Sequence, residues 1–264
     1  MKKIIALLLA VCMIAAFAGC AKSDTAATTE APTTEAPTET TEEVTAPVEA
    51  EGDVMSHADY MAAELDSPVC IETYVQAHQS WWDNKLTVYA QSEDGAYFIY
   101  NMECSEEDAA KLVPGTKIRV NGYKTEWSGE VEIAEGATFE ILEGSYIAEP
   151  QDITGGLGAQ NLIDWQNAKI SVSGLTVVAA NDEGAAFLYN WDGSGAAGNN
   201  NDLYFNVSDG TNTYTFTVES YLCGEGTDVY TTVTNLNVGD VIDVEGFLYL
   251  SLIHISEPTR PRLI

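Results

Sequence analysis

Apolar and polar positions alternate in short runs over most of the chain from about residue 70 onward, with turn residues between the runs. This period-two pattern predicts an all-β protein. In the first half the pattern predicts five strands, at Cys70–His78, Lys85–Gln91, Ala96–Met102, Lys117–Trp127 and Glu130–Leu142. An Asp94-Gly95 pair between the second and third runs indicates a β-hairpin. Short helices are predicted at His57–Leu65 and Ser105–Leu112, the latter with Ser105 as its N-cap.

The second half of the chain repeats the first. Two segments share the same spacing of apolar residues and glycines, Leu112–Tyr123 and Leu236–Phe247. Gly115 and Gly239 are expected to form the turn into the fourth strand of each half, and Gly122 and Gly246 a kink that bends this strand around a barrel. A second repeat falls at a different offset, around residues 184–190, which indicates an insertion. A hairpin in the second half is expected between Leu203–Ser208 and Thr213–Val218.

The order of these elements, three strands, a helix and two strands, resembles the oligonucleotide/oligosaccharide-binding (OB) fold. The resemblance implies two tandem, OB-like, five-stranded barrels, with domain 1 at residues 55–149 and domain 2 at residues 150–249. It also implies that a ligand lies across the second and third strands, between the first–second and fourth–fifth loops.

The N-terminal residues are expected to be removed from the mature protein. A cationic start precedes an apolar run at Ile4–Phe17, which is too short to span a bilayer and typical of a signal peptide. The following Ala18-Gly19-Cys20 resembles the bacterial lipobox, which implies cleavage of residues 1–19 and acylation of Cys20. The alternative is an ordinary secretory signal cleaved near Ala18.

Residues 20–54 consist almost entirely of Thr, Glu, Ala and Pro and contain no aromatic residue that could seed a core. Such a segment cannot offset the conformational entropy lost on ordering, so a disordered linker is predicted. With lipid on Cys20, the folded part would be held at the outer face of the bacterial cytoplasmic membrane by membrane lipid alone. In this organisation the chain resembles surface lipoproteins of gut Gram-positive bacteria.

The last residues, 250–264, are expected to be an artefact. The stretch Leu250–Arg260 resembles the translation of a transposase sequencing adapter, and it interrupts the strand pattern of domain 2 after the fourth strand. We therefore expect domain 2 to be truncated before its fifth strand and the natural C-terminus to be missing.

The charge is strongly negative, with a formal net value of −30. Domain 1 holds 18 acidic and 5 basic residues, and domain 2 holds 13 acidic residues and a single basic one, Lys169. A field of this sign repels phosphate backbones and favours cations or basic partners. Nucleic acid is therefore disfavoured as a partner.

Candidate ligand-binding residues in domain 1 are aromatic or basic. They are Trp81, Trp82, Tyr89, Tyr97, Lys117, Arg119, Tyr123 and Trp127. Flat rings can stack on sugar faces or on bases. Tyr100, on the third strand, is a further candidate. We favour core positions for all of these tyrosines and an exposed platform for Trp81 and Trp82. The two cations share one face of the fourth strand, where they either meet an anionic ligand or, as we favour, balance acids such as Glu130 and Glu132.

Metal and catalytic chemistry have little support in the sequence. Asp192, Asn199 and Asp202 lie in the insertion of domain 2 and are weak candidates for calcium, with a turn without metal as the favoured alternative. His57 and His78 stand beside no nucleophile motif, and carboxylates are too numerous for a pair to be singled out. No catalytic residue, no enzymatic activity and no cofactor is predicted.

Together these patterns predict an extracellular, membrane-anchored binding module for a glycan, a peptide or another protein. Two alternatives stay open: nucleic-acid or nucleotide binding through domain 1, and a purely structural role at the surface or in assembly.

Overall fold

The computed structural model describes residues 53–251 and 260–263, so the predicted signal peptide, Cys20 and most of the linker lie outside the described residues. In these two ranges no helix has the length and apolar character that a membrane crossing requires. Domain 1 contains α1 (His57–Ala62), β1 (Pro68–His78), β2 (Lys85–Gln91), β3 (Ala96–Glu103), α2 (Glu106–Ala109), β4 (Thr116–Trp127), β5 (Glu130–Ile133) and β6 (Thr138–Ser145).

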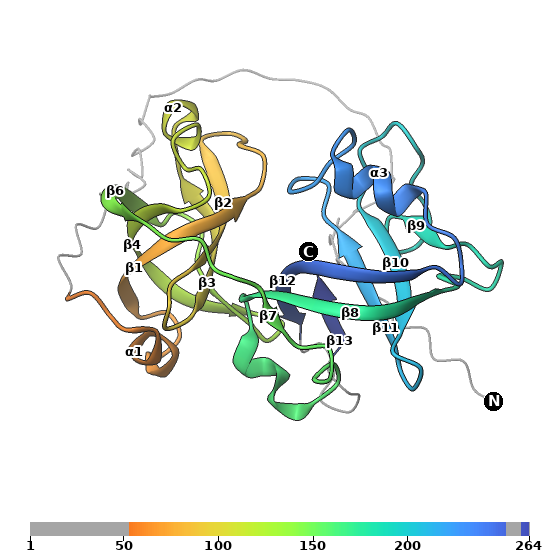
Figure 1. Ribbon diagram of the computed structural model, residues 1–264. Helices are drawn as coiled ribbons and strands as arrows, with labels where there is room; N and C mark the ends of the chain where they lie inside the picture. The colour runs from red at the N-terminus through yellow and green to blue at the C-terminus, as the bar shows by residue number, and fades with distance from the viewer. Residues whose placement is uncertain (1–52, 252–259, 264) are drawn as a thin grey trace, which may run out of the picture. The chain divides into compact units, whose positions relative to one another are not determined.

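Domain 1 is a closed five-stranded barrel (Figure 1). Its strands are hydrogen-bonded in the order β1-β2-β3-β5-β4, and the antiparallel pairing of β1 with β4, from Pro68 opposite Tyr123 to Tyr74 opposite Lys117, closes the ring. Only β3 and β5 pair in parallel within this ring. This arrangement is that of an OB-like Greek-key barrel, which confirms the predicted fold class.

The predicted fifth strand, Glu130–Leu142, is in fact two strands. β5 pairs with the last residues of β4, whereas β6 pairs with the first half of β4, on the side opposite β1. A turn at residues 134–137 separates them, and Gly136 in this turn has φ +86°, a conformation that favours glycine. The alternation of the sequence continues through this turn, which is why the pattern alone predicted one strand.

Both predicted helices of domain 1 form but are shorter than expected. In α2, Ser105 is the N-cap, and its hydroxyl accepts a hydrogen bond from the Asp108 N–H at 3.1 Å. In α1, the helix ends where the Lys124 ammonium donates to the carbonyls of Met61 and Ala63, at 2.7 and 2.8 Å. A cation at this position satisfies free carbonyls at the helix C-terminus.

Domain 2 repeats the barrel order with additions. It contains β7 (Gln151–Asp152), the 3-10 helix η1 (Gln160–Trp165), β8 (Lys169–Val178), β9 (Phe187–Tyr189), β10 (Leu203–Ser208), β11 (Thr213–Val218), α3 (Asp228–Thr234), β12 (Val241–Ser251) and β13 (Arg260–Leu263). The strand order is β11-β10-β8-β12-β13 (Figure 1). The hairpin of β10 and β11 has the bounds that the sequence predicted, and β9 pairs with β10 as an extension of the sheet.

The C-terminal strand β13 belongs to the segment that the sequence identifies as an artefact. Its residues pair antiparallel with β12, from Leu248 opposite Leu263 to Ser251 opposite Arg260, and β13 also contacts β11. The position of a fifth barrel strand in domain 2 is therefore occupied by these residues. The expected truncation of this domain stays a prediction.

Three of the repeated glycines have clear physical reasons. Gly115 and Gly239, before β4 and β12, have φ +94° and +99°, which L side chains rarely adopt. Gly122 is needed for space instead, because a Cβ there would lie 2.7 Å from the Ile133 side chain and 2.9 Å from that of Ala137. The turn predicted at Gly115 and Gly239 is therefore confirmed, whereas the kink predicted at Gly122 and Gly246 stays a prediction.

Candidate functional site

The outward face of β2 and β3, where the OB resemblance places the ligand, is covered by domain 2. Tyr89 and Phe98 lie opposite each other on these strands and are only 1% and 5% exposed. Phe247 of β12 stacks on Tyr89 with ring centroids 4.7 Å apart, and Tyr249 meets Phe98 edge-on at 5.5 Å. We refer to these four rings, which form one apolar cluster, as the aromatic interface.

Hydrogen bonds surround the aromatic interface. The Tyr89 hydroxyl donates to Glu219 Oε2 at 2.9 Å, and the Gln79 side-chain amide donates to the same oxygen at 2.7 Å. On the other side, the Lys169 N–H donates to Gln91 Oε1 at 2.8 Å. Burial and the Glu219 carboxylate raise the pKa of Tyr89 well above its ordinary value, so this phenol remains a donor.

Both loops that frame the OB ligand face also contact domain 2. In the first–second loop, the Ser80 N–H donates to the Tyr221 carbonyl at 2.7 Å. At the fourth–fifth loop, the Gln166 amide donates to the Gly129 carbonyl at 2.9 Å, and Asn167 donates to the carbonyl of Val131 at 3.1 Å. The strands and loops that the resemblance assigns to a ligand therefore form an intramolecular contact.

The candidate tyrosines divide into buried and exposed pairs. Tyr97 points into the barrel core, where it is 1% exposed and packs against Tyr60, and Tyr89 lies in the aromatic interface. Neither ring is open to a ligand, in line with the core positions favoured for them. Tyr100 and Tyr123, by contrast, are both 41% exposed, so the expectation of a core position is wrong for these two.

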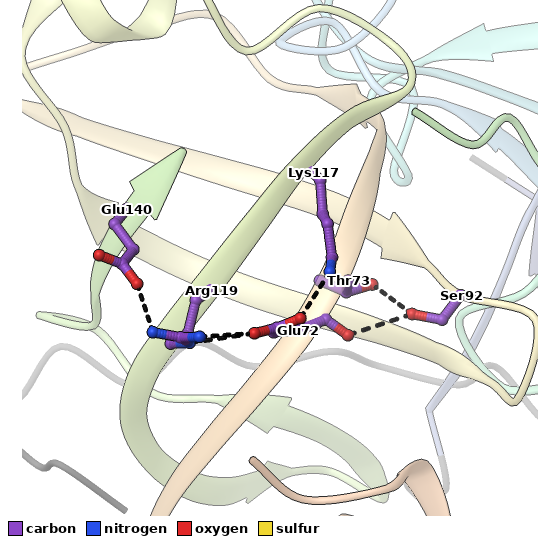
Figure 2. Close-up of polar contacts among 6 residues, drawn as sticks. All are labelled: Glu72, Thr73, Ser92, Lys117, Arg119 and Glu140. Atoms are coloured by element: carbon purple, nitrogen blue, oxygen red, sulfur yellow. Dashed lines mark hydrogen bonds and ion pairs between the residues drawn. The ribbon is translucent and has the colours of Figure 1, made fainter. Parts of the chain in front are cut away.

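The candidate cations of β4 are neutralised. Figure 2 shows Glu72 of β1 between Lys117 and Arg119, with Glu140 of β6 beyond the guanidinium. The Lys117 ammonium lies 2.6 Å from Glu72, and Arg119 contacts Glu72 at 2.7 Å and Glu140 at 2.6 Å. The favoured ion-paired interpretation therefore fits, but the partners are Glu72 and Glu140. Glu130 and Glu132, the acids suggested from the sequence, lie on β5, which pairs with a later part of β4.

The charges in this cluster lock one another in the ionised state. Hydrogen bonds from Lys117 and Arg119 hold the pKa of Glu72 below its ordinary value, and Glu72 in turn raises the pKa of both cations. The Ser92 hydroxyl donates to the Glu72 carbonyl at 3.3 Å and to the Thr73 hydroxyl at 3.2 Å, beside the ion pairs (Figure 2). An anionic ligand would have to displace carboxylates that already hold these cations.

Trp82 is the candidate residue that remains most open to solvent, with 68% of its surface exposed. It opens a two-residue turn, Asp83-Asn84, in which both residues have positive φ, and its N–H and carbonyl bond to Lys85 at 3.1 and 2.9 Å. The Asn84 carbonyl accepts a third bond from the Cys104 N–H at 2.9 Å. The turn thus has the geometry of a tight hairpin that holds the indole ring away from the barrel.

Trp81 does not belong to this exposed platform, which corrects the expectation for that residue. Its ring is half-buried against the barrel core, and its indole N–H donates to the Cys104 carbonyl at 2.8 Å. A buried indole normally finds such a partner. Trp81 therefore anchors the loop that carries Trp82.

Trp82 pairs with Lys85 across its turn, and Lys85 belongs to a group of linked polar side chains. Lys85 forms an ion pair with Glu135 in the β5–β6 turn, and the Asn101 amide donates to the other oxygen of Glu135 at 3.4 Å. The Asn101 N–H is held by the Thr87 hydroxyl at 3.1 Å. An exposed ring beside fixed amide, ammonium and carboxylate groups can stack on a sugar face and exchange hydrogen bonds with its hydroxyls.

Trp127, the other exposed tryptophan among the candidates, lies at the opposite end of the barrel. It is 50% exposed and ends β4, which runs antiparallel to β1, whereas Trp82 follows the end of β1. Tyr123 belongs to the same strand as Trp127. The predicted aromatic residues therefore do not converge on one site.

The oxygen donors proposed for calcium are used within the loop. Asp192 accepts from the Ser194 N–H at 3.0 Å, while Asp202 accepts from the N–H and hydroxyl of Ser220, both at 2.8 Å. Asn199 is exposed. In the part of the chain that the structure describes, no group of three or more His, Cys, Asp or Glu side chains could hold a metal ion. The loop has the character of a hydrogen-bonded turn.

Several interface residues were not predicted, namely Phe98, Glu219, Phe247 and Tyr249. The sequence did contain a signal for Phe98. Phe98 lies opposite Tyr89 in a hairpin, and both rings face outward, while the inward positions of the hairpin already fill the barrel. Two such rings on the outer face of a small barrel indicate a contact surface. The sequence could not show that the contact is with the same chain.

Comparison with known proteins gives little beyond this geometry. No family model matches the chain, and no curated protein matches it. Among solved structures, a murine DNA-binding protein bound to double-stranded DNA matches at 12% identity and a TM-score of 0.36, covering 73% of this chain and 90% of that one. The p204 HINb domain matches at 14% identity and a TM-score of 0.33, with 73% and 91% covered. We assign the fold from the strand pairings and draw nothing from these distant matches.

Proposed function

We propose that this protein is a lipid-anchored binding module at the outer face of the bacterial cytoplasmic membrane, and that it recognises glycans through the surface around Trp82. The proposal rests on one observation above all. A tryptophan that is 68% exposed is carried on a turn fixed by backbone hydrogen bonds, so the ring meets a ligand with little loss of conformational freedom.

The fixed polar groups beside the ring favour a saccharide over an apolar partner. Lys85, Glu135 and Asn101 are linked to one another and lie partly in solvent. Sugars present an apolar face for stacking and hydroxyl groups at their edge, and this combination of ring and polar groups suits both. The coverage of β2 and β3 by domain 2 supports a site at this loop instead of across those strands.

The anchor is argued from the sequence alone. The apolar run before Ala18-Gly19-Cys20 and the Thr/Glu/Pro-rich linker after it suit export, acylation of Cys20 and display away from the bilayer. Membrane lipid would hold the protein through the acyl chains, and the linker would give the folded part reach.

The alternative of nucleic-acid binding has less support. The outward cations of β4 are held by Glu72 and Glu140, and the chain carries a net charge of −30. Polyanion binding depends on cations that can exchange small counterions for phosphates. A structural or assembly role is the second candidate, because domain 2 occupies the face that an OB-like barrel commonly offers to a ligand.

A glycan array tests the proposal directly. The chain with Cys20→Ser, which keeps it in solution, is expected to bind a subset of glycans, and Trp82→Ala is expected to lower that binding at least tenfold. Trp127→Ala serves as the matched control, because it removes an equally large exposed ring from the other end of the barrel and should leave binding unchanged. Binding that survives Trp82→Ala would refute the proposed site, and an array without any bound glycan would favour the structural role.

A further inference from the structure

Domain 2 carries an open groove of about 690 Å³ on the side of the sheet where β9 was added. Its walls are the segment Gly184–Tyr189, two glycines of the following loop, Gly193 and Gly195, and the segment Leu236–Val238 before β12. The groove lies in the insertion that the repeat analysis detected. It is separate from the Trp82 surface, which belongs to domain 1.

The groove is open to solvent and mostly apolar. The five residues Ala185–Tyr189 are all partly exposed, although none of them is polar apart from the tyrosine hydroxyl. Val238 on the opposite wall is 50% exposed, and nearby Val241 is 69% exposed. The small walls at Ala185, Ala186 and the two glycines let a backbone approach closely, which suits an extended chain.

One edge of β9 is open for strand pairing. β9 pairs with β10 on one side, with Leu188 opposite Tyr204. On the other side the Tyr189 carbonyl accepts from the Gly195 N–H at 3.1 Å, and, within the described residues, Phe187 makes no backbone hydrogen bond outside its ladder with β10. Backbone groups alternate between the two edges of a strand, so Phe187 presents its N–H and carbonyl to the groove. Tyr189 presents its N–H only, because its carbonyl is already bonded to Gly195.

Acidic residues flank the groove. Glu183 and Asp192 are exposed directly beside the lining glycines Gly184 and Gly193, and Asp240 follows the opposite wall. Lys169, the only basic residue in 150–249, is held by Glu245 at 2.8 Å. An apolar groove in such a field attracts cationic chains and repels acidic ones.

We propose that this groove binds an extended, cationic segment of a partner protein, which adds a strand to the open edge of β9. Backbone hydrogen bonds to β9 would supply affinity, alternate apolar side chains would enter the groove, and outward lysines or arginines would face Glu183 and Asp192. A second copy of this chain is disfavoured as the occupant, because two chains of charge −30 repel each other. This site goes beyond the proposed glycan recognition and does not depend on it.

Fluorescence anisotropy with a labelled ten-residue peptide of alternating lysine and valine tests the groove, using the Cys20→Ser chain at 50 and 150 mM salt. The peptide is expected to bind with micromolar affinity. Methylation of its alternate backbone amides, which removes strand pairing and keeps charge, is expected to weaken binding at least tenfold. Trp82→Ala is expected to leave the affinity unchanged, which separates this site from the proposed glycan site.

Matched variants locate the site. Ala186→Trp, which fills the groove, should weaken binding at least tenfold, whereas Thr211→Trp, in an exposed turn at the far end of β10, should not. Glu183→Lys should weaken binding several-fold, and Glu143→Lys, an exposed acid of domain 1, should not. The proposal would be overturned if the peptide did not bind. It would also be overturned if N-methylation and Ala186→Trp both left binding unchanged, because that result would indicate a general attraction of polycations to an acidic protein.

Discussion

At the scale of single residues, exposure of Trp82 is a consequence of its turn. Asp83 and Asn84 have φ of +48° and +60°, which suits a short hairpin of the type I′ class and turns the preceding ring outward. Trp82 packs on little else, so Trp82→Ala is expected to change the free energy of unfolding by less than about 0.5 kcal/mol. Urea denaturation measures this value. A loss of several kcal/mol would mean that the ring supports the fold and that its effect on binding is indirect.

Glu72 is expected to matter for stability and for partner choice. Glu72→Gln leaves Lys117 and Arg119 without their shared carboxylate, and we expect a loss of about 1 kcal/mol, since the pairs are partly exposed to solvent. The pKa of Glu72 is depressed, so its contribution is present above its ordinary pKa and disappears as the pH falls through the lowered value. Denaturant titrations should therefore give a smaller difference in the free energy of unfolding between variant and wild type at pH 3 than at pH 7.

The same substitution tests the nucleic-acid alternative. The wild-type chain is expected to show no salt-dependent binding of single-stranded DNA, whereas Glu72→Gln should show weak, salt-sensitive binding, because Lys117 loses its carboxylate partner and Arg119 keeps only Glu140. Tight binding by the wild type that is lost on Arg119→Ala would contradict the interpretation of this cluster as a neutralised one.

At the scale of elements, β5 carries an unusual carboxyl group. Glu132 lies beside Phe98 in the β3–β5 pair, is 8% exposed, and forms no ion pair within the described part of the chain. Burial raises its pKa from 4.5 to about 7. The folded chain therefore holds more protons than the unfolded chain between these values, and the free energy of unfolding is expected to fall as the pH rises through this window.

Glu132→Gln should remove this pH dependence. Above pH 7 the variant is expected to be more stable than wild type by up to about 3 kcal/mol, the value that corresponds to a shift of about two and a half pKa units. The matched control is Glu126→Gln on the neighbouring β4, which is exposed and should leave the slope unchanged. If the free energy of unfolding of Glu132→Gln fell between pH 5 and pH 7 as steeply as that of the wild type, the raised pKa of Glu132 would not be the cause of the pH dependence.

The limits of sequence reasoning are also clearest for the elements. The bounds of β2, β10 and β11 agree with the prediction, because an Asp-Gly turn marks one end of each strand: Asp94-Gly95 follows β2, and Asp209-Gly210 joins β10 to β11. β5 and β6 were merged, because Ala134 to Ala137 continues an alternating pattern while the backbone turns. Alternation also predicts on which face of β2 the Tyr89 side chain lies, but it does not show which residues cover that face. The aromatic interface could therefore not be predicted. Trp81 and Trp82 are identical neighbours, and only the structure separates an anchor from an exposed ring.

At the scale of the whole molecule, acylation of Cys20 is expected to decide where the protein resides. In a bacterial host fed an alkyne-tagged palmitate, the wild-type chain should incorporate label and sediment with membranes. Cys20→Ser should be unlabelled and leave the membrane fraction. A wild-type chain that is released without label, with a new N-terminus near Ala18, would instead identify an ordinary secretory signal.

Contact between the two barrels is the central feature of the whole molecule. Aromatic rings and hydrogen bonds from domain 2 meet β2, β3 and both framing loops of domain 1, which leaves the Trp82 turn as the exposed aromatic surface near the OB ligand face. The proposed glycan site follows from this arrangement. If domain 2 did not cover that face, Tyr89 and Phe98 would be the better candidates.

A double-mutant cycle on Tyr89→Phe and Glu219→Met measures this contact most directly, since each change keeps most of the side-chain volume and removes one partner of the 2.9 Å hydrogen bond between the domains. The free energies of unfolding of the two single variants and the double variant are expected to give a coupling of about 1 to 3 kcal/mol, as for a buried hydrogen bond to a charged group. A coupling indistinguishable from zero would contradict the covered face and, with it, the location assigned to ligand recognition.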